Sequence, residues 1–481
     1  MTTIRTRYAP SPTGYMHVGG VRTALFAFLL ARQNNNGRFI LRLEDTDQKR
    51  EVEGSAEHLI KSLNALGISY DEGPDIGGDF APYKQSERLD IYKNWAQKLI
   101  DAGRAYADPY TGDEIQAFRD QARAAKQPFL YRNHRPENPP VWNGTTPLRF
   151  KSDPKTYAWY DEVMGRLTTG PEVIDDFILI KTDGFPTYNF AHIVDDAEMK
   201  ITHIIRGQEF ISSQPNYLNL YEALNLDHPI FATVPHIMAD AGNKKLGKRD
   251  GAKDVLEYIK DGYLPETLIN FIASMGWNDG TEQEIFSMDE LIAKFSLDRV
   301  QRSGARFDEK RLLWMNGQWI RKLSLDDLYE RVANFWPEAA ESASLDYKKQ
   351  VLAMVQDRLK VLSELPLLSS YFFEEPTPDW TMISNNKQLS KLSNDEILSF
   401  LDSAQNALLN CDHNPEAVQS TLNELLETTG QKPGILFSLI RLAVSWAPFS
   451  PALNETIAVL GKDKVQARLK LAIEIANNPT K

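Results

Sequence analysis

The 481-residue sequence has a single cysteine, Cys411. One thiol excludes an internal disulfide and any zinc site built from several thiolates. No apolar run approaches the roughly 18 residues that span a bilayer, and the N-terminus shows no pattern of a secretory signal. These absences predict a cytoplasmic protein without a membrane contact, because a reducing compartment is the simplest one for such a chain.

The sequence also lacks an excess of positive charge, since its formal net charge is −12. A general nucleic-acid binder is expected to be basic, so the net charge argues against that class. It does not exclude one specific RNA partner, which needs only local cation clusters and aromatic platforms. Hydrophobic residues at 42% and charged residues at 25% are ordinary for a globular protein, and the length predicts more than one domain.

The most informative stretch present is RYAPSPTGYMHVGG, residues 7–20. It follows a short strand-like segment, residues 3–8, and precedes a helical pattern over residues 21–33. A strand, a Gly/Pro-rich loop and a helix are how an α/β sheet presents a nucleotide-phosphate site. His17 lies at the predicted helix start, and Gly19 and Gly20 permit close approach of a ligand. Taken alone, such a junction is equally well explained as a simple turn.

A second signal lies far downstream, in NKKLGKR at residues 243–249, with four cations in seven positions. A charge run is usually a solvated face. Together with HVGG, however, it resembles the two signature motifs of class I aminoacyl-tRNA synthetases. Further stretches in chain order are similar to a bacterial-type glutamyl-tRNA synthetase: FILRLEDTDQKR, DGFPTYNFAHIVDD, IIRGQEF, WMNGQWIR and SPALNETIAVLGKDKVQARL.

This resemblance implies an α/β fold with a Rossmann-type catalytic core in residues 1–325. It implies an α+β insertion, which binds the tRNA acceptor end, at about residues 105–175, and a helical stem-contact region at about 255–325. Residues 326–481 are then an all-α anticodon-binding bundle. Some relatives carry a cysteine-based zinc site near the start of the insertion; residues 104–113 contain no cysteine, so we expect no metal site there.

The implied reaction uses ATP with Mg²⁺, L-glutamate and tRNA(Glu), and needs no protein nucleophile because positioning and charge stabilisation suffice. The resemblance assigns catalytic roles to His17, Gly19, Lys245 and Lys248. The ATP-binding residues that it implies are His17, Gly19, Gly20, Glu209 for the ribose, Ile237 and Met238 for adenine, and Lys248. The chain has Gly247 where the family usually has serine, so we expect a more flexible cationic loop.

Glutamate recognition is implied for a second group of residues. Arg7 would bind the side-chain carboxylate, a bidentate task suited to guanidinium, with Tyr188 bonded to the same group and Arg206 lining the pocket. The remaining members are Ala9 through its backbone, Ser11 and Glu44 at the α-amino group, and His192. Many relatives have asparagine in place of His192, which raises the prospect of an altered pH dependence.

Arg358 matches the position at which discriminating relatives read the third anticodon base. Two interpretations of Arg358 are open: it reads the third anticodon base, or it is an ordinary solvated helix residue. The non-discriminating alternative, which also charges tRNA(Gln), is open as well. A catalytically silent tRNA-binding paralogue is a third alternative, supported only by Gly247 and His192. The family default is a monomer.

Overall fold

The computed structural model describes residues 3–240, 244–247, 253–447 and 450–477. Lys248, to which the resemblance assigns catalytic and ATP-binding roles, lies outside the described residues. The chain divides into two compact units: unit 1 comprises Met1–Ile259 with Pro265–Glu309, and unit 2 comprises Lys260–Leu264 with Lys310–Lys481. Within the described residues, no helix combines the length and apolar character needed to cross a membrane.

Unit 1 begins with the predicted strand, loop and helix. Strand β1 (Arg5–Tyr8) pairs in parallel with β2 (Arg38–Leu41), and α1 (Val18–Arg32) joins them. Helix α1 is apolar almost all round, and its residues Leu25, Phe26 and Leu29 are fully buried. A helix with this composition lies inside a core rather than on a surface, so the loop before it is fixed in place.

A four-stranded sheet in the order β6-β5-β9-β8 forms the second part of the core. Its strands are β5 (Tyr157–Asp161), β6 (Gly165–Thr169), β8 (His203–Gly207) and β9 (Ile230–Val234). Helices α5 (Tyr188–Glu198) and α6 (Gln214–Ala223) pack in the same apolar cluster as these strands. Strands β8 and β9 are parallel, and Thr202 before β8 is bonded to Arg5 of β1. The carboxyl ends of β1 and β8 therefore open toward one site.

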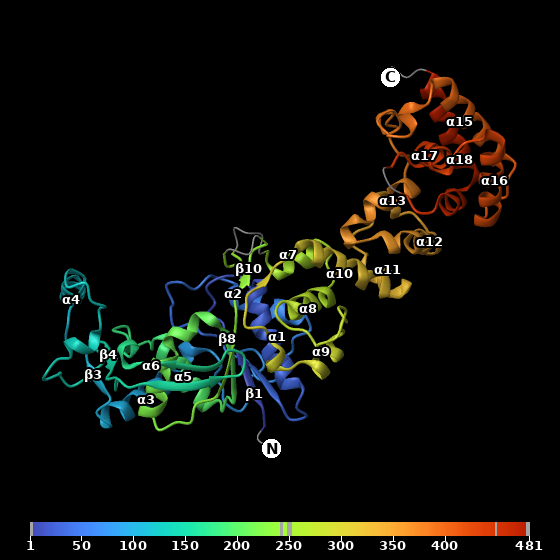
Figure 1. The fold of residues 1–481 in the computed structure, drawn as a ribbon. Helices are drawn as coiled ribbons and strands as arrows, with labels where there is room; N and C mark the ends of the chain where they lie inside the picture. The colour runs from blue at the N-terminus through green and yellow to red at the C-terminus, as the bar shows by residue number, and fades with distance from the viewer. Residues whose placement is uncertain (1–2, 241–243, 248–252, 448–449, 478–481) are drawn as a thin grey trace. The chain divides into compact units, whose positions relative to one another are not determined.

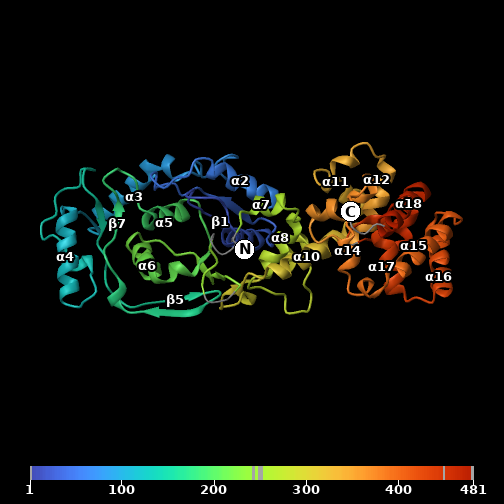
Figure 2. The ribbon, with the colours of Figure 1, turned by 90° about the horizontal axis from the view of Figure 1, so that it is seen from above.

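The insertion is a small antiparallel sheet with one helix. Its elements are β3 (Ala105–Ala107), α4 (Gly112–Ala124), β4 (Leu148–Phe150) and β7 (Ile178–Ile180). The sheet continues beyond residue 175, the end that the sequence suggested, because β7 pairs with β4. Figures 1 and 2 place α4 at the end of unit 1 remote from α1.

The other helices of unit 1 surround this core. They are α2 (Ser55–Ala65), α3 (Leu89–Asp101), α7 (Val255–Lys260), α8 (Pro265–Ser274) and α9 (Met288–Lys294). A two-residue strand, β10 (Ile237–Met238), pairs with β11 (Ala305–Arg306). Helix α8 contacts α1 and therefore covers another apolar face of that helix.

Unit 2 is helical throughout its described residues. Its helices are α10 (Glu309–Lys322), α11 (Leu325–Arg331), α12 (Leu345–Val355), α13 (Leu365–Phe373), α14 (Thr381–Ser384), α15 (Asn394–Leu409), α16 (Pro415–Thr429), α17 (Pro433–Ser445) and α18 (Leu453–Asn477). Helix α18 contacts α15, α16 and α17 around one apolar core, and a smaller core lies among α10 to α13. Asn316 of α10 bonds to Leu264 and Lys360, which assigns α10 to unit 2. The compact units thus divide at residues 309–310 rather than 325–326. The α/β core, α+β insertion and all-α C-terminal part match the predicted fold class.

Candidate active site

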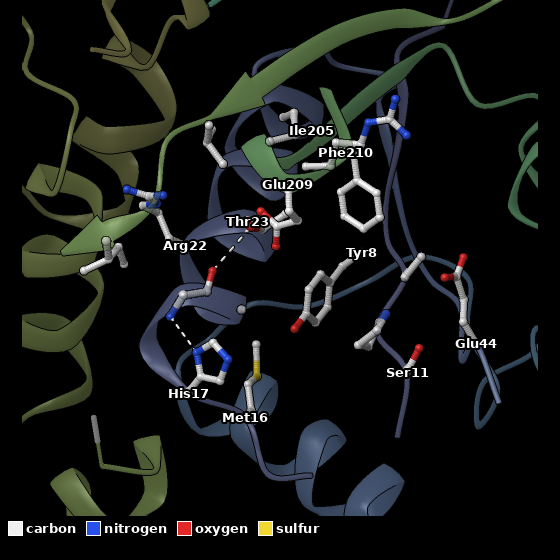
Figure 3. Close-up of a pocket in the computed structure, with 18 of the residues that line it drawn as sticks. Tyr8, Ser11, Met16, His17, Arg22, Thr23, Glu44, Ile205, Glu209 and Phe210 are labelled. Carbon is white, nitrogen blue, oxygen red and sulfur yellow. Dashed lines mark hydrogen bonds between the residues drawn. The ribbon is translucent and has the colours of Figure 1, made fainter. Parts of the chain in front are cut away.

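A cavity in unit 1 has a volume of about 540 Å³. It opens at the carboxyl ends of β1 and β8, in front of the N-terminus of α1 (Figure 3). Twelve of the sequence-predicted residues line it: Arg7, Ala9, Ser11, His17, Gly19, Gly20, Glu44, Tyr188, Arg206, Glu209, Ile237 and Lys245. Segments distant in the sequence are therefore brought together at one site, as an open α/β sheet requires at its ligand-binding edge.

His17 is the N-cap of α1. Its Nδ1 accepts a hydrogen bond of 3.1 Å from the backbone N–H of Gly19 (Figure 3). An imidazole whose Nδ1 accepts carries its proton on Nε2 when neutral. His17 thus offers a donor at Nε2, beside the partial positive charge of the helix N-terminus, and this combination suits phosphate oxygens.

Steric crowding within the protein, and not only ligand access, favours glycine at positions 19 and 20. A Cβ on Gly20 would lie 2.6 Å from Oη of Tyr8, and one on Gly19 would lie 3.0 Å from Cε1 of His17. Both positions therefore exclude a side chain while Tyr8 and His17 keep their places. The sequence did not single out Tyr8, which is buried under the loop.

A buried ionic cluster forms the floor of the cavity. Nε of Arg7 lies 3.1 Å from Asp196, and Arg42 pairs with Asp196 at 2.9 Å and with Glu44 at 3.0 Å. Burial would raise the pKa of Asp196, but the Arg7 and Arg42 guanidiniums hold it below its usual value. For Glu44 burial prevails over the nearby cations and raises the pKa to about 7. The cluster therefore presents a cation, Arg7, and an acid whose charge depends on pH, Glu44.

Arg206 lies among aromatic rings at the end of β8. Its guanidinium carbon is 5.3–5.5 Å from the ring centroids of Phe210, Tyr217 and Phe231. Such contacts stabilise a buried cation without neutralising its charge. Arg206 thereby remains available to an anionic group in the cavity.

His192 does not line the cavity. It lies behind Tyr188, with the two rings stacked at 4.7 Å, and Nδ1 of His192 is 2.7 Å from the carbonyl oxygen of Tyr188. Burial lowers the pKa of His192 to about 3, so the imidazole is neutral at physiological pH. The structure therefore gives His192 a supporting contact to Tyr188 and does not support the altered pH dependence that its presence suggested.

The opposite side of the cavity is lined by Glu209, which follows β8, and by the β9–β10 junction. Glu209 lies 3.5 Å from Nζ of Lys245 and 3.6 Å from His236. Ile237 lines the cavity, whereas Met238 does not and instead lies beside Gly304. Met238 is therefore not part of the cavity wall, and the adenine contact expected of the backbone near Ile237 and Met238 stays a prediction.

Sequence reasoning missed Arg22, a buried cation on α1. It donates hydrogen bonds to the carbonyl oxygens of Met275 and Pro235, and burial lowers its pKa to about 10. The available signal was an arginine within an otherwise apolar helix. Phe210, His236 and Tyr8 are further lining residues that the sequence did not single out.

In unit 2, Arg358 ends the short 3₁₀ turn Gln356–Arg358 and is exposed. Burial and the nearby Arg358 charge together lower the pKa of Arg441. The buried hydroxyl of Tyr371, beside both arginines, has no hydrogen-bond partner among the described residues. Two like charges held close together favour an anionic or electron-rich ligand. Arg441 and Tyr371 were not predicted.

Among the described residues, no group of three or more His, Cys, Asp and Glu side chains is arranged to hold a metal ion. In the insertion, Asp108 pairs with Arg149 at 2.7 Å and accepts from Tyr131 at 2.5 Å. Asp176 pairs with Arg135 at 2.7 Å. These contacts join the start of the insertion to its later strands.

Comparison with known families defines the class. Residues 3–314 match the family described as tRNA synthetases class I (E and Q), catalytic domain, and residues 327–473 match the anticodon binding domain. The structure and this match agree on a class I synthetase core followed by a helical domain.

Full-length relatives define the particular family. The chain is 40% identical to the glutamate–tRNA ligase of Clostridium tetani, covering 99% of this chain and 98% of that one. It is 39% identical to the glutamate–tRNA ligase of Dehalococcoides mccartyi, covering 98% and 97%. A solved glutamate tRNA ligase from Elizabethkingia meningosepticum, in complex with its amino acid, superposes with a TM-score of 0.89 at 32% identity, covering 98% and 99%. The chain belongs to the glutamate–tRNA ligase family.

Proposed function

We propose that this chain activates L-glutamate with ATP and transfers the glutamyl group to the 3′-terminal adenosine of tRNA(Glu). The observation that carries the proposal is the charge pattern of the cavity. Arg7 and Arg206 border it together with the acid Glu44. Glutamate carries two carboxylates and one ammonium group, so this set of charges is complementary to it.

In the first step, a carboxylate oxygen of glutamate attacks the α-phosphorus of ATP, and pyrophosphate leaves. Mg²⁺ supplied with the ATP would neutralise part of the phosphate charge. Arg7 and Tyr188 bind the side-chain carboxylate, so that only the α-carboxylate is free to react. Glu44 in its ionised form, with Ser11 and the backbone at Ala9, holds the α-ammonium group. Catalysis then follows from alignment of the two reactants.

ATP binds on the other side of the cavity. His17 donates from Nε2 to a phosphate oxygen, Gly19 and Gly20 admit the nucleotide to the helix N-terminus, and Glu209 accepts from the ribose. Lys245 is displaced from Glu209 to meet the charge that develops on the leaving pyrophosphate. By resemblance Lys248 has the same task.

In the second step, a hydroxyl group of the terminal tRNA ribose attacks the activated carbonyl, and AMP leaves. We assign acceptor-end binding to the insertion at about residues 105–180, stem contact to the helices after residue 255, and anticodon binding to residues 326–481. Arg358, supported by Arg441, reads the third anticodon base. This restricts charging to tRNA(Glu), and charging of tRNA(Gln) is the alternative that Arg358 opposes. We further propose a monomer in the cytoplasm.

ATP–pyrophosphate exchange tests the chemistry. With tRNA(Glu) present, exchange is expected with glutamate and absent with glutamine or aspartate. The tRNA is included because relatives often need it to activate glutamate. Exchange that does not depend on the amino acid supplied would contradict the proposal, and no exchange with any amino acid would favour the silent paralogue.

A further inference from the structure

The turn that carries His17 is supported from behind by helix α2 and by the first residues of α7. Ser55 of α2 donates a 3.0 Å hydrogen bond to the carbonyl oxygen of Gly14. The ring of His58, one helical turn further along α2, stacks on Tyr15 with centroids 4.4 Å apart and planes inclined by 25°. These contacts hold residues 14–15 against α2.

Asp254 supports the same turn from the other side. Its backbone forms an antiparallel bridge with His17, and the N–H of the next residue, Val255, lies 3.4 Å from the carbonyl oxygen of Met16. The carboxylate of Asp254 has two tasks. Oδ1 accepts a 2.7 Å hydrogen bond from Leu256 N–H at the start of α7, and Oδ2 lies 2.8 Å from Nε2 of His58.

His58 is therefore the point at which the two supports meet. One face of its ring contacts Tyr15, and its edge contacts Asp254. Both His58 and Asp254 are largely shielded from water, with side chains 17% and 11% exposed. Among the described residues no donor meets the geometry of a regular hydrogen bond to Oδ2, so the contact is defined by the 2.8 Å approach of Nε2 of His58.

We infer that His58 and Asp254 form a pair of positioning residues that fix the catalytic turn at His17. Neither is among the residues that line the cavity, so they act through the backbone of residues 14–17 and not on substrate. The inference rests on the role proposed for His17. The His58–Asp254 pair keeps Nε2 of His17 aligned with a phosphate oxygen of ATP. This matters because a displacement near 1 Å costs roughly a hundredfold in rate.

The decisive variants separate the contacts. His58→Ala removes both the stack and the pair, whereas His58→Gln retains a donor toward Asp254. Asp254→Asn keeps the cap of α7, because asparagine caps helices as well as aspartate does, but removes the charge. Lys61→Ala, an exposed residue on α2, is the matched control.

We expect His58→Ala to lower kcat of glutamate-dependent pyrophosphate exchange roughly tenfold, a smaller loss than the hundredfold of a full 1 Å displacement. The KM for glutamate stays unchanged, because Arg7 and Glu44 are not touched. His58→Gln restores most of the rate, and Lys61→Ala has no effect. In the double variant His58→Ala/Asp254→Asn the loss is less than the product of the two single losses, as expected of one shared interaction.

Multiplicative losses in the double variant would overturn the inference, as would a wild-type kcat in His58→Ala. An equal rise in the KM for glutamate would also overturn it, because general loosening of unit 1 moves both parameters. His17→Ala separates the inference from the proposed function. If His17→Ala abolishes exchange while His58→Ala keeps the wild-type kcat, only the pair is wrong; if His17→Ala has no effect, the proposed role of His17 is wrong.

Discussion

The two compact units bury charge very differently. The buried charged side chains of unit 1 include Arg7, Arg22, Arg42, Glu44, Asp45, Glu72, Arg88, Asp108, Arg149, Asp161, Asp176, Asp195, Asp196 and Arg206. Among the described residues of unit 2, only Arg468 is a buried charged side chain. Removing an ion from water costs several kcal/mol unless it is paired and hydrogen-bonded. Unit 1 therefore carries an electrostatic cost that unit 2 avoids.

The difference shows where the chemistry lies. In unit 1 four of these buried charges line the cavity, where a substrate with three charged groups and a nucleotide would meet: Arg7, Arg22, Glu44 and Arg206. In unit 2 the apolar residues form the core, and the cations that would contact RNA, Arg358 foremost, remain at the surface. Changes to buried charges should thus affect activity in unit 1 and stability in unit 2.

The largest effect is expected from Arg7→Ala. This change removes the cation for the substrate carboxylate and leaves Asp196 paired with Arg42 alone. Losing one partner of a buried charge pair costs 2–5 kcal/mol, so kcat/KM for glutamate should fall by roughly a thousandfold. Steady-state pyrophosphate exchange measures it. Arg38→Ala on the adjacent strand, where the cation is 55% exposed, is the control; a similar loss there would refute the assignment.

The counterpart in unit 2 is Arg468→Met. Arg468 donates to the carbonyl oxygens of Val444 and Tyr371 and to Glu375. Methionine fills much of the volume but leaves these acceptors unpaired, so we expect a loss of about 3 kcal/mol in unfolding free energy. Urea denaturation measures it, with Lys470→Met as the exposed control on α18. Unchanged stability would remove the contrast between the units.

Selectivity should respond to Arg358→Gln. A base-reading arginine contributes 1–3 kcal/mol of discrimination, so the preference for tRNA(Glu) over tRNA(Gln) should fall roughly thirtyfold. Charging of the two tRNAs in parallel measures this ratio. The same ratio in Arg358→Gln as in wild type would return Arg358 to an ordinary solvated role; Lys360→Gln controls for loss of charge.

A pH effect of about tenfold is expected in the KM for glutamate. The pKa of Glu44 is raised to about 7, so below pH 7 the carboxyl is increasingly neutral and loses its attraction for the α-ammonium group. The KM should rise roughly tenfold as the pH falls from 8 to 6, since one unit below the pKa leaves a tenth of the group ionised. Glu44→Gln should have a high and pH-independent KM. An inflection that persists in Glu44→Gln would assign the titration to another group.

Removal of zinc is expected to have no effect on charging activity. The insertion lacks cysteine at residues 104–113 and is held instead by ionic contacts of Asp108 and Asp176. We expect elemental analysis to find no stoichiometric zinc, and a zinc-selective chelator in the presence of excess Mg²⁺ to leave charging unaltered. One zinc per chain, lost together with activity, would contradict this prediction.

The sequence predicted the parts of the fold that depend on local pattern. The strand, loop and helix at residues 3–33 and the helical C-terminal half were confirmed, because periodicity and Gly/Pro punctuation determine them. It did not predict β7 as part of the insertion. A three-residue strand is too short to show a periodicity, and β7 joins this sheet only through its pairing with β4.

For the candidate site, motif matching found twelve of the residues that line the cavity but not the residues that are held by contacts with distant segments. Arg22 and His58 contact other segments, and no local pattern indicates which distant segment a side chain will meet. His192 is the converse case. Its motif position indicated a binding role, whereas its burial behind Tyr188 is a property of the packed core.

The most direct test is charging of tRNA(Glu) and tRNA(Gln) transcripts with labelled glutamate, ATP and Mg²⁺. The same assay is repeated with both tRNAs carrying their natural base modifications. We predict glutamylation of tRNA(Glu), little of tRNA(Gln), and none of either by Arg7→Ala. Efficient charging of both would keep the chemistry of unit 1 and remove the selectivity assigned to unit 2. Failure of the wild-type chain to glutamylate either tRNA, in transcript or modified form, would contradict the central claim.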